Sequence, residues 1–166
     1  FGPSAVPRTD LLLNELCAEA AIGRPLQLQS DGQSWRPFMP VGDFARALTM
    51  AALRAPQTDE GRPVWNIAPP AMQMTVREAT SRAARSAQVP LPFLGPQSAA
   101  DRRSYRVSGA KFLRAFPDFT YSSDFDAAIA ATIAAYKAIP SLRHDMHNDR
   151  FVRLAAFKRA HLAKSA

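Results

Sequence analysis

The stretch that decides the fold reads SDGQSWRPFMPVGD and spans residues 30–43. We interpret it as the end of one strand, an Asp-Gly turn, a second strand and the start of a helix. The Asp-Gly dipeptide favours a tight turn because these residues tolerate backbone angles that most others avoid. Pro37 and Pro40 have no amide hydrogen to donate, so the second strand should be short or lie at a sheet edge.

On either side of this stretch, extended and helical patterns alternate. Apolar or alternating runs predict short strands at 26–28, 64–68, 89–94 and 105–107. Apolar residues at helical spacing predict helices over about 11–22, 43–54, 76–87, 109–116, 124–137 and 151–162. This order predicts an α/β or α+β domain in which a small mixed sheet is covered by helices.

Certain residues are expected to mark the helix ends. Thr9 and the aspartate after it should cap the first helix, and Gly23 should end it. The sequence TVRE from Thr75 fits a capping box, and SDFD from Ser123 resembles another. Ser108 should cap the helix that follows it. Asp43 is expected to cap a helix whose apolar face consists of Phe44, Ala47, Leu48, Ala51 and Ala52.

Composition narrows the classes of function. The 166 residues suffice for one domain with a core, and the net charge of +7 favours a phosphorylated or polyanionic partner. The basic residues are spread along the chain rather than blocked together, which disfavours nucleic-acid binding. The single cysteine, Cys17, cannot form an internal disulfide, so a reducing, cytoplasmic setting is expected. Its position on an apolar helix face predicts a buried, inert thiol.

Other features of the sequence say less about the function. No uninterrupted apolar run of ~18 residues and no leader pattern are visible, so neither a membrane span nor a signal peptide is expected. The opening Phe1-Gly2-Pro3 is typical of a strand end followed by a turn, and we therefore expect the chain to be incomplete at its N-terminus. His144 and His147 could share a helix face, but no third ligand is signalled, so no metal site is predicted.

Two arginines carry the strongest chemical signal. Arg36 follows the Asp-Gly turn, and a second arginine-bearing stretch, DRRSYRV, occupies residues 101–107. Guanidinium groups bind phosphate oxygens through paired hydrogen bonds, so two of them brought together would hold a diphosphate. The second stretch offers three candidates for the partner of Arg36, namely Arg102, Arg103 and Arg106.

In this order, these pieces resemble the extended short-chain dehydrogenase/reductase family, the NAD-dependent nucleotide-sugar epimerases and dehydratases. The resemblance is to the C-terminal half of that family and covers nearly the whole chain. Three positions depart from the usual pattern, namely Pro40, Ala68 and Ser108. The matching pieces are Phe1-Gly2-Pro3, Asn14, Asp31-Gly32 with Arg36, Val41 and Asp43, then Asn66-Ile67-Ala68, and finally Asp101, Arg103, Tyr105 and Lys111.

The resemblance implies a fold and a set of roles. Residues 1–166 would be the C-terminal, substrate-binding portion of a Rossmann-type enzyme, without its N-terminal dinucleotide-binding portion. Arg36 and Arg103 would neutralise the diphosphate of a nucleotide-sugar, and Asn14 would contact its phosphate or sugar. The cofactor would be NAD or NADP, bound mainly outside this chain, and the intact enzyme would form a homodimer.

The chemistry of the family needs residues that this sequence does not contain. The dinucleotide fingerprint requires closely spaced glycines, and no two of the seven glycines fit it. The family's catalytic Tyr-x-x-x-Lys pair is also missing, since Gly109, Phe125 and Pro140 stand four residues after the three tyrosines. No catalytic residue is therefore assigned, and the isolated chain is expected to be inactive and poorly stable.

Two other interpretations stay open. The chain could be a non-catalytic basic module that binds RNA or another polyanion, or an inactive truncated remnant. The sequence does not say which base or sugar is bound, nor does it separate an epimerase from a dehydratase or a reductase.

Overall fold

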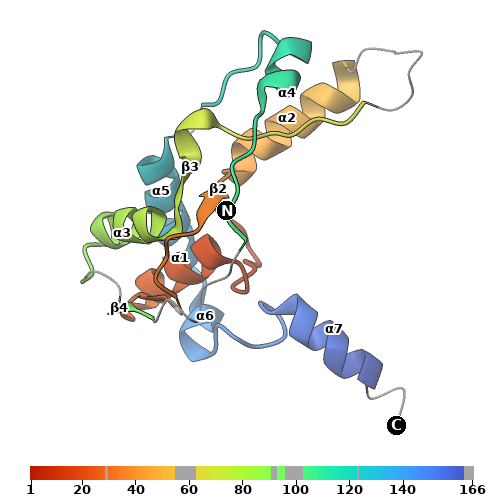
Figure 1. Ribbon diagram of the computed structural model, residues 1–166. Helices are drawn as coiled ribbons and strands as arrows, with labels where there is room; N and C mark the ends of the chain where they lie inside the picture. The colour runs from red at the N-terminus through yellow and green to blue at the C-terminus, as the bar shows by residue number, and fades with distance from the viewer. Residues whose placement is uncertain (29, 55–62, 91–92, 96–102, 123, 163–166) are drawn as a thin grey trace.

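The computed structural model describes residues 1–28, 30–54, 63–90, 93–95, 103–122 and 124–162. A central group of three helices, α1, α3 and α5, has α2 and α4 at one end and α7 at the other (Figure 1). In chain order the elements are α1 (Leu12–Ile22), β1 (Gln27–Leu28), β2 (Trp35–Pro37), α2 (Val41–Arg54), the 3₁₀ turn η1 (Pro70–Met72), β3 (Gln73–Thr75), α3 (Val76–Ala87), β4 (Phe93–Leu94), α4 (Ala110–Ala115), α5 (Phe125–Lys137), α6 (Pro140–His144) and α7 (Arg153–Leu162).

The strands form two separate pairs rather than one mixed sheet. β1 runs parallel to β4, and β2 runs antiparallel to β3, with Arg36 opposite Met74. The two strands that flank the Asp-Gly turn therefore do not pair with each other, contrary to the expected strand pair. The α/β class is confirmed, and the second strand is short, as its two prolines predict.

The Asp-Gly turn explains why the flanking strands separate. Gly32 has a left-handed backbone, with φ at 70°, and its carbonyl accepts a 2.8 Å hydrogen bond from the Arg77 amide. The Ser34 carbonyl accepts a 3.0 Å bond from the Val76 amide. The turn is thus bound to the start of α3, and the chain leaving it runs beside β3 instead of returning along β1.

Two of the predicted strands do not form. Residues 64–68 are extended, and Trp65 and Ile67 pack on buried phenylalanines while Val64 is 76% exposed, but no strand among the described residues pairs with them. Residues 105–107 lie beside β2 with one backbone bond, from the Tyr105 amide to the Trp35 carbonyl, which is too few for a ladder.

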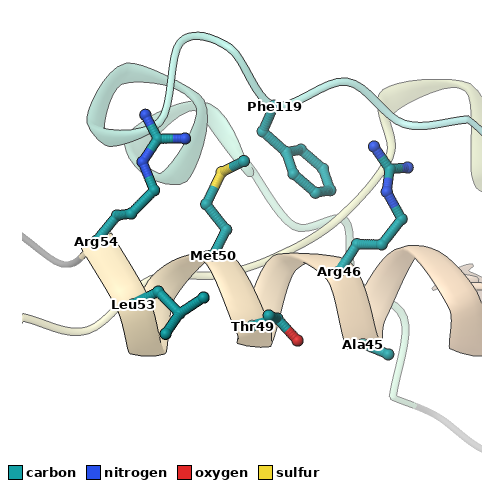
Figure 2. A pocket seen from close by; sticks show the side chains of 7 residues that line it. All are labelled: Ala45, Arg46, Thr49, Met50, Leu53, Arg54 and Phe119. Carbon is teal, nitrogen blue, oxygen red and sulfur yellow. The ribbon is translucent and has the colours of Figure 1, made fainter.

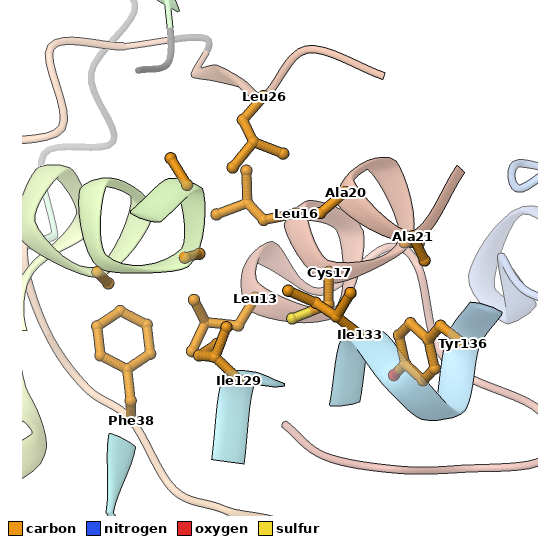
Figure 3. Packing of buried hydrophobic residues seen from close by; sticks show 14 of the residues in the cluster. Leu13, Leu16, Cys17, Ala20, Ala21, Leu26, Phe38, Ile129, Ile133 and Tyr136 are labelled. Atoms are coloured by element: carbon orange, nitrogen blue, oxygen red, sulfur yellow. The ribbon is translucent and has the colours of Figure 1, made fainter. Parts of the chain in front are cut away.

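The main core lies between α1, α3 and α5. Leu13 and Leu16 of α1 point toward α3 and α5, where Ile129 and Ile133 meet them (Figure 3). Cys17 is buried in the same cluster and is not in a disulfide, as predicted. Burial raises the pKa of its thiol to about 12, so the sulfur stays protonated and unreactive near neutral pH.

A second, smaller core joins α2 to α4. Its buried members are Ala47 of α2 and three aromatic side chains, Phe112, Phe116 and Phe119. The apolar face predicted for α2 is only partly used, since Ala47 is buried whereas Phe44 is 42% and Leu48 is 50% exposed. That face was predicted from periodicity alone, and among the described residues only its Ala47 edge has aromatic partners to pack against.

The helix ends test the capping predictions. Thr75 caps α3 by accepting a 3.1 Å bond from the Glu78 amide, and Gly23 ends α1 with φ at 77°, both as predicted. Asp124 caps α5 by accepting a hydrogen bond from the Ala127 amide, and Ser123, where the predicted capping box begins, lies outside the described residues. Gly109 holds the cap position of α4, and the Ser108 hydroxyl before it accepts a hydrogen bond of 3.4 Å from the Ala110 amide, the first of the helix.

The cap predicted for α1 is wrong. Leu11 occupies the cap position and offers no side-chain hydrogen bond. The buried Thr9 hydroxyl instead donates to the Met146 carbonyl, and the Thr9 amide donates to the Phe151 carbonyl at 3.3 Å. None of the helices in the described part of the chain is both long and apolar enough to cross a bilayer.

Candidate functional site

Arg36 occupies the centre of β2 and is partly buried there. Its guanidinium donates 2.8 Å to the Trp35 carbonyl and also donates to the Arg103 carbonyl. The same group lies over the Tyr105 ring, 5.1 Å from the ring centroid. The structure therefore brings the two arginine-bearing stretches together, and Arg36 touches the backbone of Arg103.

The second stretch is held against β2 mainly by side chains. The Trp35 amide donates to the Ser104 hydroxyl at 3.0 Å, and the Gln73 side chain makes two hydrogen bonds with the Val107 backbone. The Arg106 guanidinium lies 3.6 Å from the centroid of the Trp35 ring. The Arg103 side chain is exposed at this edge, while its rival Arg102 lies outside the described residues.

A cavity of about 500 Å³, which we call the Arg36 cavity, opens beside this junction. Its walls come from α1, β1, β2 and the start of α3, with a histidine from the loop after α6. Arginine lies on one side and two carboxylates of α1 lie on another, so the cavity offers both anion-binding and hydrogen-bond-accepting groups. The residues that line it are Leu12, Glu15, Glu19, Gln27, Leu28, Ser30, Arg36, Val76 and His147.

The carboxylates of the Arg36 cavity are perturbed. Burial, reinforced by the charge of Glu15, raises the pKa of Glu19 to about 7, although a hydrogen bond from the Gln27 backbone and the charge of Arg24 act in the opposite direction. Burial also raises the pKa of Glu15. One oxygen of Glu19 is buried without a hydrogen-bond partner among the described residues. Glu19 was not among the predicted site residues. The signal that could have found it is the helical spacing between Glu15 and Glu19.

Asn14 lies on the first turn of α1 but outside the Arg36 cavity. The residue is 8% exposed, and within the described part of the chain its buried amide oxygen has no hydrogen-bond partner. Two smaller cavities meet at Asn14, and both also contain Phe1 and Leu11. The first, of about 280 Å³, adjoins Phe38 and shares Leu12 with the Arg36 cavity, and we call it the Phe38 cavity.

The second cavity at Asn14 measures about 240 Å³. It lies between the N-terminal loop, α1, the start of α2 and the start of α7, and Arg8 and Arg153 line it, so we call it the Arg8–Arg153 cavity. The three cavities therefore follow one another around the first turns of α1. Neighbouring cavities share Leu12 at one boundary and Asn14 at the other.

Asp43 has a structural role other than the predicted helix cap. It lies within the first turn of α2, and its carboxylate is fully buried at 0% side-chain exposure. It accepts hydrogen bonds of 3.2 and 2.8 Å from the Ser122 amide and hydroxyl, and 2.8 Å from Arg46. Asp43 therefore fastens α2 to the segment that leads into α5.

A separate groove of about 450 Å³ runs along α2. Arg46 and Arg54 rise on either side of Met50 and Phe119, and Leu53 lies at the rim (Figure 2). Both arginines are held by carboxylates, since Arg46 contacts Asp43 and Arg54 contacts Asp118. In the part of the chain that the structure describes, His, Cys, Asp and Glu form no group that could hold a metal ion.

Comparison with known proteins supports the resemblance. Residues 1–68 match the sequence model of the NAD dependent epimerase/dehydratase family. These residues contain α1, β1, β2, α2 and two of the three predicted site residues, Asn14 and Arg36. A search among curated proteins found no match.

Solved structures extend the likeness to most of the chain. RMD from Pseudomonas aeruginosa, complexed with NADPH, is 19% identical with a TM-score of 0.67, over 82% of this chain and 45% of that one. WbmF from Bordetella bronchiseptica, in complex with NAD⁺ and UDP, is 20% identical with a TM-score of 0.67, over 88% and 47%. MoeE5, in complex with UDP-glucuronic acid and NAD, is 26% identical with a TM-score of 0.65, over 81% and 43%.

These findings confirm the predicted resemblance. The chain is like the NAD-dependent epimerase/dehydratase family in sequence over residues 1–68 and like Rossmann-type nucleotide-sugar enzymes in fold over most of its length. It spans less than half the length of each of these solved structures.

Proposed function

We propose that this chain is the substrate-binding portion of an NAD-dependent nucleotide-sugar epimerase or dehydratase. The observation that carries the proposal is the contact between the backbone of Arg103 and Arg36, a residue that lines a cavity of about 500 Å³. Two arginine-bearing segments meeting beside a cavity of this size suit a diphosphate with a nucleoside attached. UDP in the complex of WbmF, a protein of the same fold, supports a nucleotide ligand.

The row of cavities suggests how the ligand lies. We place the nucleoside in the Arg36 cavity, the diphosphate at Arg36 and Arg103, and the sugar near Asn14. The unpartnered amide oxygen of Asn14 suits a sugar hydroxyl, because a buried acceptor without a donor costs free energy that a ligand would recover. Leu12 and Asn14, which separate neighbouring cavities, would then lie along the ligand.

The cofactor would be held mainly by other parts of the intact enzyme. A dinucleotide needs a glycine-rich turn at a helix N-terminus, and the glycines of this chain do not supply one. The residues present therefore do not fit a complete NAD or NADP site, and we assign no catalytic residue here. Hydride transfer, the choice between epimerase, dehydratase and reductase, and dimer formation would belong to the intact enzyme.

Calorimetric titration of the chain with UDP-, dTDP- and GDP-sugars tests the proposal. At least one should bind, and Arg36→Ala should weaken binding at least tenfold because charge-assisted bonds to the diphosphate are lost. Arg36→Lys should give an intermediate loss, since an ammonium group keeps the charge without the paired donors. Arg114→Ala, an exposed arginine of α4 outside the cavity, is the control. No binding by any of the three would overturn the proposal.

The same kind of titration, repeated at several salt concentrations, distinguishes nucleotide-sugar binding from the polyanion-binding alternative. An RNA-binding surface releases many counterions, so its affinity should fall steeply as salt rises. A nucleotide-sugar held by two arginines should show a much shallower dependence. Tight, steeply salt-dependent binding of an RNA oligonucleotide, without binding of nucleotide-sugars, would favour the basic-module interpretation.

A further inference from the structure

The Arg8–Arg153 cavity has a positive wall that the diphosphate does not explain. Arg8 reaches it from the N-terminal loop and Arg153 from the first turn of α7. These residues are far apart in sequence, and the Thr9 contacts with Met146 and Phe151 bring their segments together. Phe151 is fully buried, so the start of α7 is anchored beside the N-terminal loop rather than resting on it loosely.

The charges at this wall do not cancel. Arg8 binds Asp10 with two hydrogen bonds, Nε to Oδ1 at 3.1 Å and Nη2 to Oδ2 at 2.8 Å. The Arg8 hydrogen bond lowers the pKa of Asp10, and the nearby charge of Arg153 lowers it further. Asp10 thus pairs with Arg8 and lies within the electrostatic influence of Arg153, and the three formal charges sum to +1. Glu15 is also near, but its side chain lines the Arg36 cavity instead.

Asn14 adds a second kind of recognition at the same cavity. Asn14 is only 8% exposed, and its buried amide oxygen is an acceptor without a donor among the residues that the structure describes. A ligand for this cavity should therefore present a hydroxyl to Asn14 and an anionic group to the two arginines. A neutral hexose supplies the first group but not the second.

We propose that the Arg8–Arg153 cavity binds a carboxylate carried by the sugar, so that the substrate is a nucleotide-uronic acid. The inference rests on the proposed function, because the diphosphate at Arg36 fixes which end of the ligand reaches Asn14. In a nucleotide-uronic acid the sugar ring separates its carboxylate from the diphosphate. That order of groups matches the order of the cavities around α1, from Arg36 through Asn14 to Arg153.

Two matched pairs of nucleotides test the inference by calorimetry on the full chain. UDP-glucuronic acid is compared with UDP-glucose, and GDP-mannuronic acid with GDP-mannose. In at least one pair, the uronic acid should bind at least tenfold more tightly, the equivalent of about 1.4 kcal/mol. Equal binding of both members would overturn the inference and leave the proposed function intact. If no member of either pair or of the dTDP-sugars bound, the proposed function itself would fail.

Variants of its arginines test whether the Arg8–Arg153 cavity causes the preference for the uronic acid. Arg153→Gln should reduce the preference for the uronic acid to less than threefold while leaving the affinity for the neutral partner unchanged. Replacing Arg8 by Gln together with Asp10 by Asn keeps the net charge of the wall at +1 but removes one guanidinium group that would donate to the carboxylate, so it should also reduce the preference.

Arg150→Gln is the matched control, since Arg150 is exposed three residues before Arg153 and lies outside the cavity. Circular dichroism confirms that each variant is folded. A preference that survives both cavity variants would contradict the assignment, even if the wild-type chain favours uronic acids.

Discussion

At the scale of single residues, the chain shows how one environment can change the chemistry of a common side chain. Glu19 and Glu15 face the same cavity from successive turns of α1, and only Glu19 is shifted as far as a pKa of about 7. Burial makes the charged form costly, and the neighbouring carboxylate adds to that cost. The consequence is a group that changes charge near neutral pH.

The Glu19→Gln variant should lose part of the pH dependence of stability. Folded Glu19 holds its proton up to about pH 7, whereas the unfolded chain releases it near 4.5. The free energy of unfolding of the wild type should therefore fall as pH rises through this window. The melting temperature of Glu19→Gln, measured at pH 5 and pH 8, should change less than that of the wild type. An equal change in both proteins would contradict the assignment.

Asp43 should be the most sensitive carboxylate of the second core. Oδ1 of its fully buried carboxylate accepts bonds from Ser122 and Arg46, so Asp43→Ala should cost about 2–3 kcal/mol of unfolding free energy. Chemical denaturation measures the loss. Asp118→Ala, which removes an exposed ion pair with Arg54, should have little effect. Equal losses in the two variants would show that burial at Asp43 is not the cause.

At the scale of elements, the turn that begins at Asp31 directs the chain from β1 to β2. Gly32 combines a left-handed φ of 70° with a close approach to α3, since an added Cβ would lie 2.9 Å from the Arg77 amide nitrogen. Gly42, in the first turn of α2, has open space around the same position. The backbone angle and the neighbouring helix therefore constrain position 32 to glycine, whereas position 42 has room for a side chain.

Substituting the two glycines by alanine should give opposite results. Gly32→Ala should destabilise the protein by about 1–2 kcal/mol, because the left-handed backbone is strained for alanine and the new methyl group meets the α3 backbone. Gly42→Ala should be neutral or stabilise it by up to about 1 kcal/mol through helix propensity. Thermal denaturation of both variants provides the comparison. A stable Gly32→Ala protein would mean that the turn can move away from α3.

The elements also show what the sequence could and could not predict. The start of α3 was predictable because Thr75 and Glu78 form their cap within four residues. The predicted strand at 64–68 depended on a pairing partner, which a local pattern does not supply. Thr9 looked like a cap, but contacts with Met146 and Phe151 determine its role.

The candidate site likewise has features that the sequence could predict and features that it could not. The resemblance predicted that Arg36 and Arg103 act on one diphosphate, and the structure brings the two stretches that carry them together. The separation of Asn14 from the Arg36 cavity, and the participation of Glu19 and Arg153, depend on how α1 is turned and where α7 is anchored. Those are tertiary properties that no spacing along the chain encodes.

At the scale of the whole molecule, the two cores differ in size and in exposure. The core between α1, α3 and α5 contains most of the buried apolar side chains, whereas the α2–α4 core has four buried members and leaves Phe44 and Leu48 of α2 exposed. The stability of the chain should therefore be uneven.

Amide hydrogen exchange should detect this difference. We expect the amides of α2 and α4 to exchange faster than those of α1 and α5, because opening the smaller core exposes less apolar surface. Exchange measured by mass spectrometry on peptides from these helices gives the comparison. Uniform protection across all four helices would show that the two cores unfold as one unit.

The fastening of the first residues to the last has a consequence for synthesis of the protein. Tyr136 donates to the Gly2 carbonyl, Thr9 donates to Met146, and α1 packs on α5 more than a hundred residues later. On the ribosome, α1 must therefore wait, with its leucine face uncovered, until nearly all of this sequence has emerged. A nascent chain with such long-range closure folds late, and during that interval the uncovered leucines of α1 are a natural target for a chaperone.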